Sequence, residues 1–356
     1  MKAAVLKTRV PELEVEQVAD PVVTAGSAVV KVIASPVVHY YRHVLSGTVP
    51  FPMQLPIIPG CSSVGIVEQV GSDARAINPG DLVFCDPTIR SRDDSHTPDT
   101  ILQGLFCPDG GLSDTYRNGG FAEKVIMPLE NLFVIPETLK KKYDPVQFIS
   151  INAMLVAYGG LLTGELQAGE TVVVLGGTGY FGSTAIVVAL AMGARRVVAP
   201  TRDVSKLQSL QERFGDRVAP VALGSDEQAN IEAIQAAAQG PIDMALDLLD
   251  AGAPATIVRA TLSSIRPHGK MILMSGSDKT VELPYYLIMS RSLTVKGCFM
   301  YPRTAGKTLI GMVDAGIIDL SQFDTSSRFS LDNVNDAMAH AEEHSQRFKL
   351  TSIVFE

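Results

Sequence analysis

The sequence predicts an α/β protein with two parts, and two patterns along the chain indicate this fold. Up to about residue 135, short apolar β-like segments are separated by turns that contain Gly and Pro. From about residue 150, β-like and helical segments alternate, which is typical of a doubly wound parallel sheet. A chain of 356 residues is long enough to hold both parts.

In the first part, turn residues separate the expected strands. Strands are predicted at 28–34, 64–71 and 82–84, the last of them after the turn Asn78–Asp81. Residues 85–118 are polar and rich in Asp, Arg, Gly and Pro. We therefore expect them to form a long excursion outside the core.

The second part is expected to contain strands at 171–175, 196–199, 244–248 and 271–274. Helical patterns follow the first strand as far as Gly193 and recur at 228–238 and 255–265. Beyond about residue 300, we expect helices at 305–314 and 331–344 and strands at 326–330 and 351–355.

The composition excludes several classes of protein. With 46% hydrophobic and 19% charged residues, the chain is an ordinary globular protein, and its net charge of −8 argues against nucleic acid or an anionic membrane as a partner. Four scattered cysteines fit a reducing compartment. Lys7 interrupts any apolar signal core, and apolar stretches such as 185–192 are shorter than the ~20 residues of a membrane span. We expect a cytoplasmic protein.

A glycine motif lies between a predicted strand and a predicted helix. It has the pattern G-x-G-x-x-G and consists of Gly177, Thr178, Gly179, Tyr180, Phe181 and Gly182. In this context the pattern predicts a dinucleotide-binding turn. Gly177 is expected to allow the tight turn, Gly179 the approach of a pyrophosphate, and Gly182 the packing of helix on strand. The alternative is a βα turn without a ligand.

The end of the second predicted strand favours NADP(H) over NAD(H). Thr201 stands where an acidic residue would hold the ribose of NAD, and Thr201, Arg202 and Lys206 offer partners for a 2′-phosphate. Asp203 either turns inward, against this preference, or caps the next helix. Ser275-Gly276 follows the predicted strand 271–274, at the sheet edge where ligands dock.

Several segments together resemble the medium-chain dehydrogenase/reductase family over essentially the whole chain. They are 59–71, 79–83, 120–124, the glycine motif and 293–297. The resemblance implies a GroES-like catalytic domain (residues 1–151 and 301–356) and a Rossmann domain (152–300). Segment 293–297 resembles the edge strand through which family members dimerise, so a homodimer is expected.

The chain departs from the zinc-dependent members of this family at their ligand positions. Val38 stands at a Cys position, Gly60-Cys61-Ser62 replaces Gly-His-Glu, and Asn152 stands at the last ligand. Cys85 and Cys107 are the cysteines available in place of the four of the structural zinc lobe. Zn²⁺ needs more ligands than these, so we expect no bound metal. The chain thus resembles the zinc-lacking branch of quinone oxidoreductases and enoyl reductases.

The resemblance places Tyr40 where the family has its catalytic hydroxyl. A tyrosine is a suitable proton donor for the oxygen that becomes negative after hydride transfer. Tyr41, His39 and Asn152 are further catalytic candidates. For each of them a structural role is the alternative: packing for the tyrosines, a surface position for His39 and a helix start for Asn152.

The function expected from these observations is NADPH-dependent reduction of a small enone, quinone or other activated carbonyl compound. A first alternative is a metal-free alcohol/carbonyl dehydrogenase. A second, from another class, is an NADPH-binding sensor or structural protein without turnover.

Overall fold

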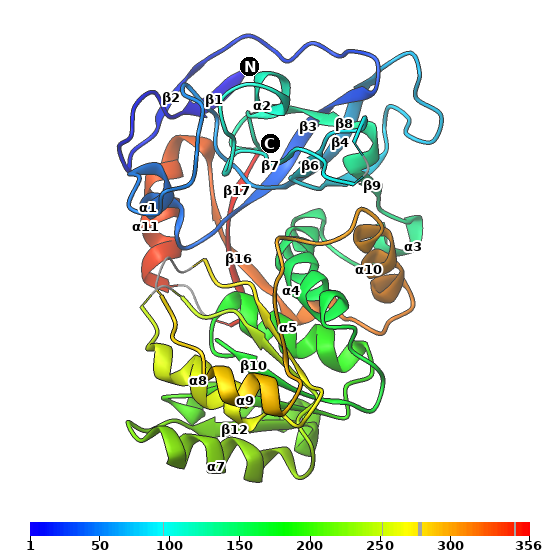
Figure 1. Cartoon of the computed structure of the whole chain (residues 1–356). Coiled ribbons are helices and arrows are strands. Elements are labelled where there is room, and N and C mark those ends of the chain that lie inside the picture. The colour runs from blue at the N-terminus through cyan, green and yellow to red at the C-terminus, as the bar shows by residue number, and fades with distance from the viewer. Residues whose placement is uncertain (95, 251, 277–279, 345–346) are drawn as a thin grey trace. The chain divides into compact units, whose positions relative to one another are not determined.

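The computed structural model describes all residues except 95, 251, 277–279 and 345–346 (Figure 1). Its contacts divide the chain into two compact units. The first contains Met1–Asn152 and most of the chain from Gly306 onwards, and the second contains Ala153–Ala305. Each unit is built around its own sheet and its own apolar core.

The first unit is organised around one long strand, β3 (Ser27–Val37). It belongs to a seven-stranded sheet in the order β16-β17-β3-β4-β5-β9, with β8 also paired to β3. The other strands of this sheet are β4 (Ser63–Val70), β5 (Leu82–Cys85), β8 (Lys124–Pro128), β9 (Leu132–Val134), β16 (Asp324–Phe329) and β17 (Lys349–Val354). Alternate residues Ala28, Val30 and Val32 of β3 face one core, as the period of two in a strand requires.

Shorter elements complete this unit. The strands β1 (Lys2–Val5) and β2 (Glu14–Gln17) pair with each other. The helices are α1 (Tyr41–Leu45), α2 (Leu112–Tyr116), α3 (Glu137–Lys140), α10 (Ala305–Asp314) and α11 (Val334–His344). Arg42 and His43 of α1 both pair with Glu342 of α11, so the helix that follows β3 is tied to the C-terminal helix.

The prediction that residues 85–118 lie outside the core is wrong. The strands β6 (Thr88–Arg90) and β7 (Thr100–Leu102) pair within this segment, and α2 follows them. Ile89, Leu102 and Cys107 are each no more than 1% exposed. The segment has a polar composition, but most of its apolar side chains, among them Ile89, Ile101, Leu102 and Leu105, are buried.

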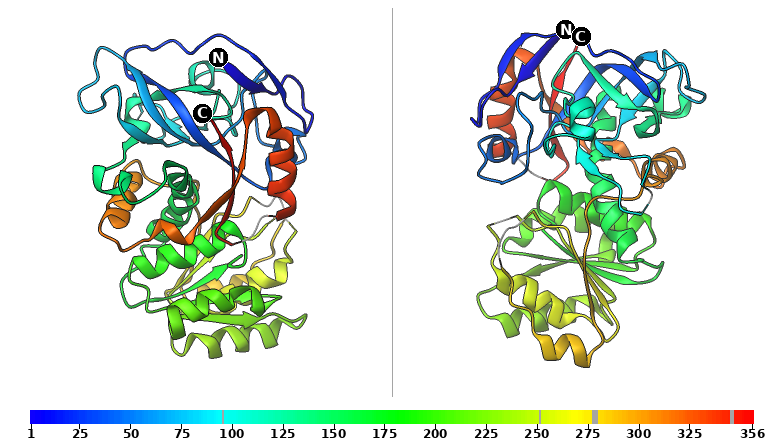
Figure 2. Two further views of the ribbon diagram at one scale, coloured as in Figure 1. Left: turned by 180° about the vertical axis from the view of Figure 1, so that it is seen from behind. Right: turned by 45° about the horizontal axis from the view of Figure 1, so that its top comes forward.

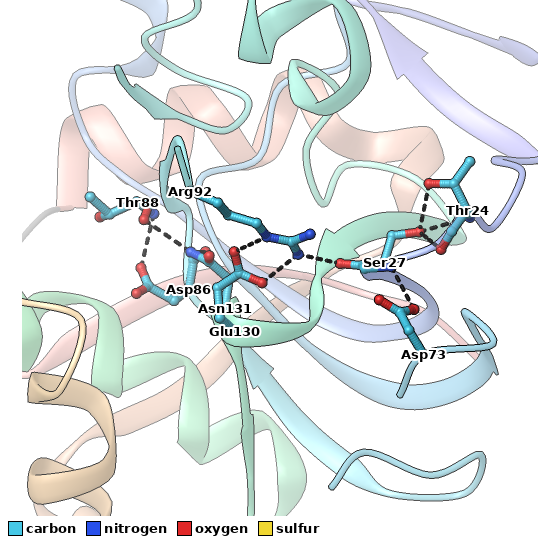
Figure 3. A network of polar contacts seen from close by, with 9 residues as sticks. Thr24, Ser27, Asp73, Asp86, Thr88, Arg92, Glu130 and Asn131 are labelled. Atoms are coloured by element: carbon cyan, nitrogen blue, oxygen red, sulfur yellow. Dashed lines mark hydrogen bonds and ion pairs between the residues drawn. The ribbon is translucent and has the colours of Figure 1, made fainter. Parts of the chain in front are cut away.

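One arginine ties this segment to the sheet. Arg92 donates to both carboxylate oxygens of Glu130, at 2.6 and 2.5 Å, and to the carbonyl oxygen of Gly26, at 2.5 Å (Figure 3). Asp73 accepts a hydrogen bond from the Gly26 N–H at 2.7 Å, so Gly26 is held from both sides. Arg92 therefore connects the segment to the start of β3 and has a structural role.

A long apolar helical segment runs from Pro145 to Thr163. It starts with a 3₁₀ turn capped by Asp144 and continues as α4 (Ile151–Thr163). Its 19 residues would suffice to cross a membrane by length and composition, and it is longer than the apolar stretch 185–192. Because 78% of its apolar window is buried inside the structure, this helix is a core element.

The second unit contains a six-stranded parallel sheet in the order β12-β11-β10-β13-β14-β15. Its strands are β10 (Thr171–Leu175), β11 (Arg196–Thr201), β12 (Val218–Ala222), β13 (Met244–Asp247), β14 (Lys270–Leu273) and β15 (Thr294–Gly297). Its helices are α5 (Tyr180–Ala191), α6 (Gln208–Phe214), α7 (Glu227–Ala238), α8 (Ala255–Ser264) and α9 (Tyr285–Ser290). Figure 2 shows helices on both faces of this sheet. The predicted doubly wound fold is confirmed.

The strand order of this sheet locates a ligand site. The chain proceeds from β10 outward to β12 and then returns to β13 on the other side of β10. At such a reversal the connections leave β10 and β13 in opposite directions, which opens a crevice at their carboxyl ends. The glycine motif follows β10 at this point, so the topology places it at the expected docking edge.

Candidate dinucleotide-binding and catalytic site

The turn after β10 depends on Gly176, which lies directly before the G-x-G-x-x-G motif. Gly176 has a φ of 81°, a left-handed conformation that L side chains rarely adopt. A Cβ on Gly176 would also lie 2.7 Å from the carbonyl oxygen of Leu248. The tight turn is therefore made by Gly176, and its assignment to Gly177 from the sequence is wrong. The pattern G-x-G-x-x-G fits the sequence only when it starts at Gly177, so it does not include Gly176.

The three motif glycines meet different surroundings. A Cβ on Gly177 would lie 3.1 Å from Ile186 and 3.3 Å from Ala199, and one on Gly182 would lie 2.1 Å from the carbonyl oxygen of Gly176. Both positions thus bring α5 close to the sheet. A Cβ on Gly179 would have one neighbour, at 3.5 Å, so the backbone there is open to the approach of a ligand.

The first turn of α5 fits the diphosphate of a dinucleotide. Gly179 is its N-cap and no side chain caps it, so the first N–H groups of the helix are available to an anion. Thr178 and Phe181 are half-buried beside the turn, and Tyr180 is buried. These residues would hold NAD(P) by backbone N–H groups and by the positive end of the helix dipole.

The loop after β11 carries the predicted 2′-phosphate ligands. Thr201 is buried, and its hydroxyl accepts a hydrogen bond from the Asp203 N–H at 3.1 Å. Arg202 and Lys206 are exposed. Asp203 accepts hydrogen bonds from the N–H and the hydroxyl of Ser205, which lower the pKa of its carboxyl group. Of its two alternatives, Asp203 takes the role of a cap, for the 3₁₀ helix Val204–Leu207.

Ser275 and Gly276 lie at the same edge of the sheet. The Ser275 hydroxyl donates to the carbonyl oxygen of Leu249 at 2.7 Å, which links the segments that leave β14 and β13. A Cβ on Gly276 would meet no atom within 4 Å. Asp247 ends β13 nearby, and burial raises the pKa of its carboxyl group.

Tyr40 and Tyr41 lie at the start of a short helix that follows β3. β3 ends at Val37, Tyr40 is the N-cap of α1, and Tyr41 is the first residue of that helix. The Tyr41 ring is fully buried against Phe121, with ring centres 5.2 Å apart, and its hydroxyl accepts a hydrogen bond from the Cys61 N–H. Tyr41 therefore holds the backbone at Cys61 in place.

Tyr40 is half-buried, and its ring meets the edge of the His39 ring at 5.2 Å between centres. Burial raises the pKa of the Tyr40 hydroxyl, and the nearby Cys61 thiol raises it further. At neutral pH this hydroxyl is therefore protonated and can donate a hydrogen bond. His39 contacts Tyr40 and is half-buried as well.

Asn152 is the centre of a buried polar cluster. Its amide nitrogen donates to the carbonyl oxygen of Cys61 at 3.0 Å and to the hydroxyl of Ser62 at 2.9 Å. Ser62 has a φ of 79°, which is unfavourable for a residue with a side chain, and the Ser35 hydroxyl donates to its carbonyl oxygen at 2.8 Å. Asn152 and Ser35 together hold this strained residue. Ser35 and Ser62 were not among the predicted site residues, although the replacement of Gly-His-Glu at 60–62 pointed to Ser62.

The predicted catalytic residues therefore converge on one segment. Tyr41 and Asn152 both bind the backbone of Cys61, the Cys61 thiol raises the pKa of Tyr40, and His39 contacts Tyr40.

The cysteines of this unit are not arranged as zinc ligands. Within the described part of the chain, no group of three or more His, Cys, Asp or Glu side chains lies together to hold a metal ion. Burial raises the pKa of the thiols of Cys61 and Cys85 to about 12 and that of Cys107 to about 11. The Cys107 thiol lies 3.4 Å from the carbonyl oxygen of Leu102, its hydrogen-bond acceptor. The residues present do not fit a zinc ion.

Comparison with known families agrees with the two units. Residues 24–137 match the family model of the alcohol dehydrogenase GroES-like domain, and residues 181–315 match that of the zinc-binding dehydrogenases. A Moraxella sp. alcohol dehydrogenase is 27% identical over 337 residues, which cover 94% of each chain. An acryloyl-coenzyme A reductase of Metallosphaera sedula is 30% identical over 227 residues, which cover 61% of this chain and 63% of the relative.

A solved structure has the same fold over the whole chain. It is a protein of Sinorhizobium meliloti 1021 bound to NADP, described like the second family model as a zinc-binding dehydrogenase. It is 25% identical, covers 99% of each chain and gives a TM-score of 0.80. The GroES-like unit, the Rossmann unit with its glycine turn and these likenesses lead to one assignment. The chain belongs to the medium-chain dehydrogenase/reductase superfamily and is an NAD(P)-dependent oxidoreductase of that type.

Proposed function

We propose that this oxidoreductase works without zinc and uses NADPH to reduce an enone, a quinone or another activated carbonyl compound. The observation that carries the proposal is the hydrogen-bonded cluster of Asn152, Cys61 and Ser62. These residues stand at positions where zinc-dependent relatives would have metal ligands. Here the Asn152 amide nitrogen donates hydrogen bonds within the protein. The side chain of Val38, at another ligand position, has no atom that could coordinate a metal.

The chemistry that suits such a site is hydride transfer with a proton supplied by the protein. The nicotinamide, when bound, supplies the hydride. Hydride addition to an enone leaves negative charge on the carbonyl oxygen, and a nearby hydroxyl stabilises that charge. Tyr40 would donate this hydrogen bond or proton, while Tyr41 and Asn152 hold the backbone at residues 61–62. The name of the acryloyl-coenzyme A reductase relative agrees with reduction of an activated double bond.

Two alternatives have their own support. A metal-free alcohol/carbonyl dehydrogenase is favoured by relatives named alcohol dehydrogenases, among them the Moraxella protein. An NADPH-binding protein without turnover would need only the glycine turn and the loop after β11. Such a protein would retain the fold and cofactor binding, and it would oxidise no NADPH.

The preference for NADPH is supported by the loop after β11. One oxygen of the Asp203 carboxylate, Oδ1, is engaged as a helix cap, and the strand-end position where an acid would hold the ribose of NADH is Thr201. The exposed Arg202 and Lys206 leave two cations in the same loop for a 2′-phosphate.

A homodimer and a cytoplasmic location remain predictions. β15 is an edge strand of the parallel sheet, and an uncovered edge invites pairing. Exposed apolar side chains lie close to it in sequence: Leu283, Tyr285, Tyr286, Met289 and Phe299. A second copy of the chain paired along β15 would cover part of this surface.

The proposed reaction predicts a specific product. With NADPH and a simple enone, we expect the saturated ketone to form, because hydride adds to the carbon–carbon double bond. Purified tag-free protein is expected to hold no stoichiometric zinc and to keep its activity after treatment with a chelator. The measurements are product identification and metal analysis of the same preparation.

Each alternative gives a different result in this experiment. An allylic alcohol as the product would favour the alcohol/carbonyl dehydrogenase. NADPH binding without oxidation across a panel of enones, quinones and aldehydes would favour the non-catalytic protein. About one tightly held zinc per chain would contradict zinc independence.

The cofactor preference can be tested with Arg202→Ala. We expect the affinity for NADPH to fall roughly 10- to 100-fold, because a hydrogen bond to a charged phosphate is lost, while the affinity for NADH changes little. Arg213→Ala is a matched control, since Arg213 is an exposed arginine in the same unit. Titration with both nucleotides measures the effect, and tighter binding of NADH by the unmodified protein would reverse the assignment.

Dimerisation can be tested at the exposed aromatic side chains near β15. Tyr286→Asp is expected to weaken a dimer because it places a charge on an apolar surface. Ile317→Asp is the control, since Ile317 is an exposed apolar residue of the first unit. Light scattering at micromolar concentration should show a dimer for the wild type and the control. A monomeric wild type would refute the proposal.

The role of Tyr40 predicts that Tyr40→Phe lowers turnover without weakening NADPH binding. Removing one donor to a developing negative charge costs about 2.7–4 kcal/mol in other enzymes, so kcat and kcat/KM should both fall roughly 100- to 1000-fold. Because burial raises the Tyr40 pKa, the wild-type rate should show no loss from deprotonation of this group up to about pH 10.

A suitable control for Tyr40→Phe is Tyr143→Phe, which removes another buried hydroxyl of the same unit, bonded to Asp319. It is expected to leave turnover unchanged. An unchanged kcat in Tyr40→Phe would reduce Tyr40 to a packing residue and shift attention to Tyr41 and His39.

A further inference from the structure

The Tyr180 side chain carries a buried hydroxyl without a partner. Tyr180 is the first residue of α5, directly after Gly179, and is 8% exposed. Among the residues that the structure describes, none forms a hydrogen bond with its hydroxyl. A buried polar group in this state costs free energy, so its presence calls for an explanation.

Two other buried tyrosines of this protein have hydrogen-bond partners for their hydroxyls. The Tyr41 hydroxyl is bonded to the Cys61 N–H, and the Tyr143 hydroxyl donates to Asp319 at 3.0 Å. The Tyr180 ring is held against Phe181, with ring centres 5.4 Å apart and planes at 63°. A phenylalanine would make the same ring contact without an unpaired hydroxyl, so packing alone does not account for a tyrosine here.

The position of Tyr180 indicates which ligand would satisfy the hydroxyl. It opens a helix of 12 residues whose N-terminus no side chain caps, and anions bind at such a terminus. A Cβ built on Gly179, one residue earlier, would meet one neighbouring atom within 4 Å, the carbonyl oxygen of Gly176 at 3.5 Å. Burial raises the pKa of the Tyr180 hydroxyl, so it remains a donor at neutral pH.

We propose that the Tyr180 hydroxyl donates a hydrogen bond to the diphosphate of the bound dinucleotide and is left unpaired in the cofactor-free protein. This inference rests on dinucleotide binding at the glycine turn and needs neither the NADPH preference nor the proposed substrate. It has two consequences of opposite sign. The hydroxyl makes the free protein less stable than a phenylalanine would, and it makes cofactor binding tighter.

The variant Tyr180→Phe tests both consequences. Without nucleotide, we expect its melting temperature to be about 2–4 °C above that of the wild type, because the unpaired hydroxyl is gone. Its affinity for NADPH, NADH and ADP should fall by a similar factor of about ten, because all three carry the diphosphate. Thermal unfolding and calorimetric titration supply these measurements.

Tyr143→Phe is the matched control, because it removes a buried hydroxyl that has a partner. It should lower the melting temperature and leave the three affinities unchanged. The opposite changes in melting temperature, and the loss of affinity in Tyr180→Phe alone, distinguish a hydroxyl that binds a ligand from one that stabilises the fold.

Several outcomes would overturn the inference. Unchanged affinities in Tyr180→Phe would mean that the hydroxyl makes no hydrogen bond to the cofactor. A lower affinity together with a lower melting temperature would mean that the substitution damages the turn. Weaker binding of NADPH and NADH without weaker binding of ADP would place the contact elsewhere on the cofactor. If the unmodified protein binds none of the three nucleotides, dinucleotide binding itself fails and not only the role of Tyr180.

Discussion

The contact between Gly182 and the carbonyl oxygen of Gly176 sets the geometry on which cofactor binding depends. A side-chain carbon at Gly182 would lie 2.1 Å from that oxygen, which is too close for two non-bonded atoms. Without side chains at these positions, α5 can start directly against the end of β10. The free N–H groups of the helix then lie at the edge of the sheet where the strand order reverses. The left-handed Gly176 makes this approach possible, since a residue with a Cβ would be strained there and would meet Leu248.

In the first unit, hydrogen bonds hold one residue in an unfavourable backbone conformation. Ser62 keeps an unfavourable backbone conformation because the Asn152 amide binds its hydroxyl and the Ser35 hydroxyl binds its carbonyl oxygen. Tyr41 adds a third attachment at the neighbouring Cys61 N–H. Together these bonds fix the backbone at the positions where zinc-dependent relatives would place metal ligands. Hydrogen bonds, donated by the Asn152 amide, the Ser35 hydroxyl and the Cys61 N–H, therefore hold these positions in the structure.

The sequence predicted local features well and tertiary features poorly. The bounds of β10 and α10 agree with the predicted ranges, because a run of valines before glycine and an amphipathic helix are local signals. β12 was missed because Val218–Ala222 is short, contains Pro220 and lies outside any clear alternation. The burial of residues 85–118 depends on contacts with distant segments, such as that of Arg92 with Gly26, which no local pattern reveals.

The same limit applies to the candidate site. Gly177, Gly179 and Gly182 could be predicted because they match a motif of fixed spacing, whereas Gly176 lies one position before that motif. That Asp203 would cap rather than turn inward was left open, because the choice depends on the hydroxyl of Ser205. The turn from β3 into α1 was missed because residues 34–41 contain no helix signal strong enough to compete with their β-like composition.

The turn at Ser62 and the glycine turn share a physical property, which is that each retains an unfavourable local state. One retains a serine in a left-handed conformation, and the other retains a buried hydroxyl without a partner. At the start of β3, by contrast, the left-handed position is occupied by Gly26, and its N–H and carbonyl oxygen are both bonded. Unfavourable local states persist in a fold only where the surrounding contacts enforce them, and they are commonly found at functional sites. At Ser62 the enforcing contacts are within the protein. At Tyr180 the missing partner is the one that a bound diphosphate would supply, so occupancy of the turn and the stability of the second unit should rise together.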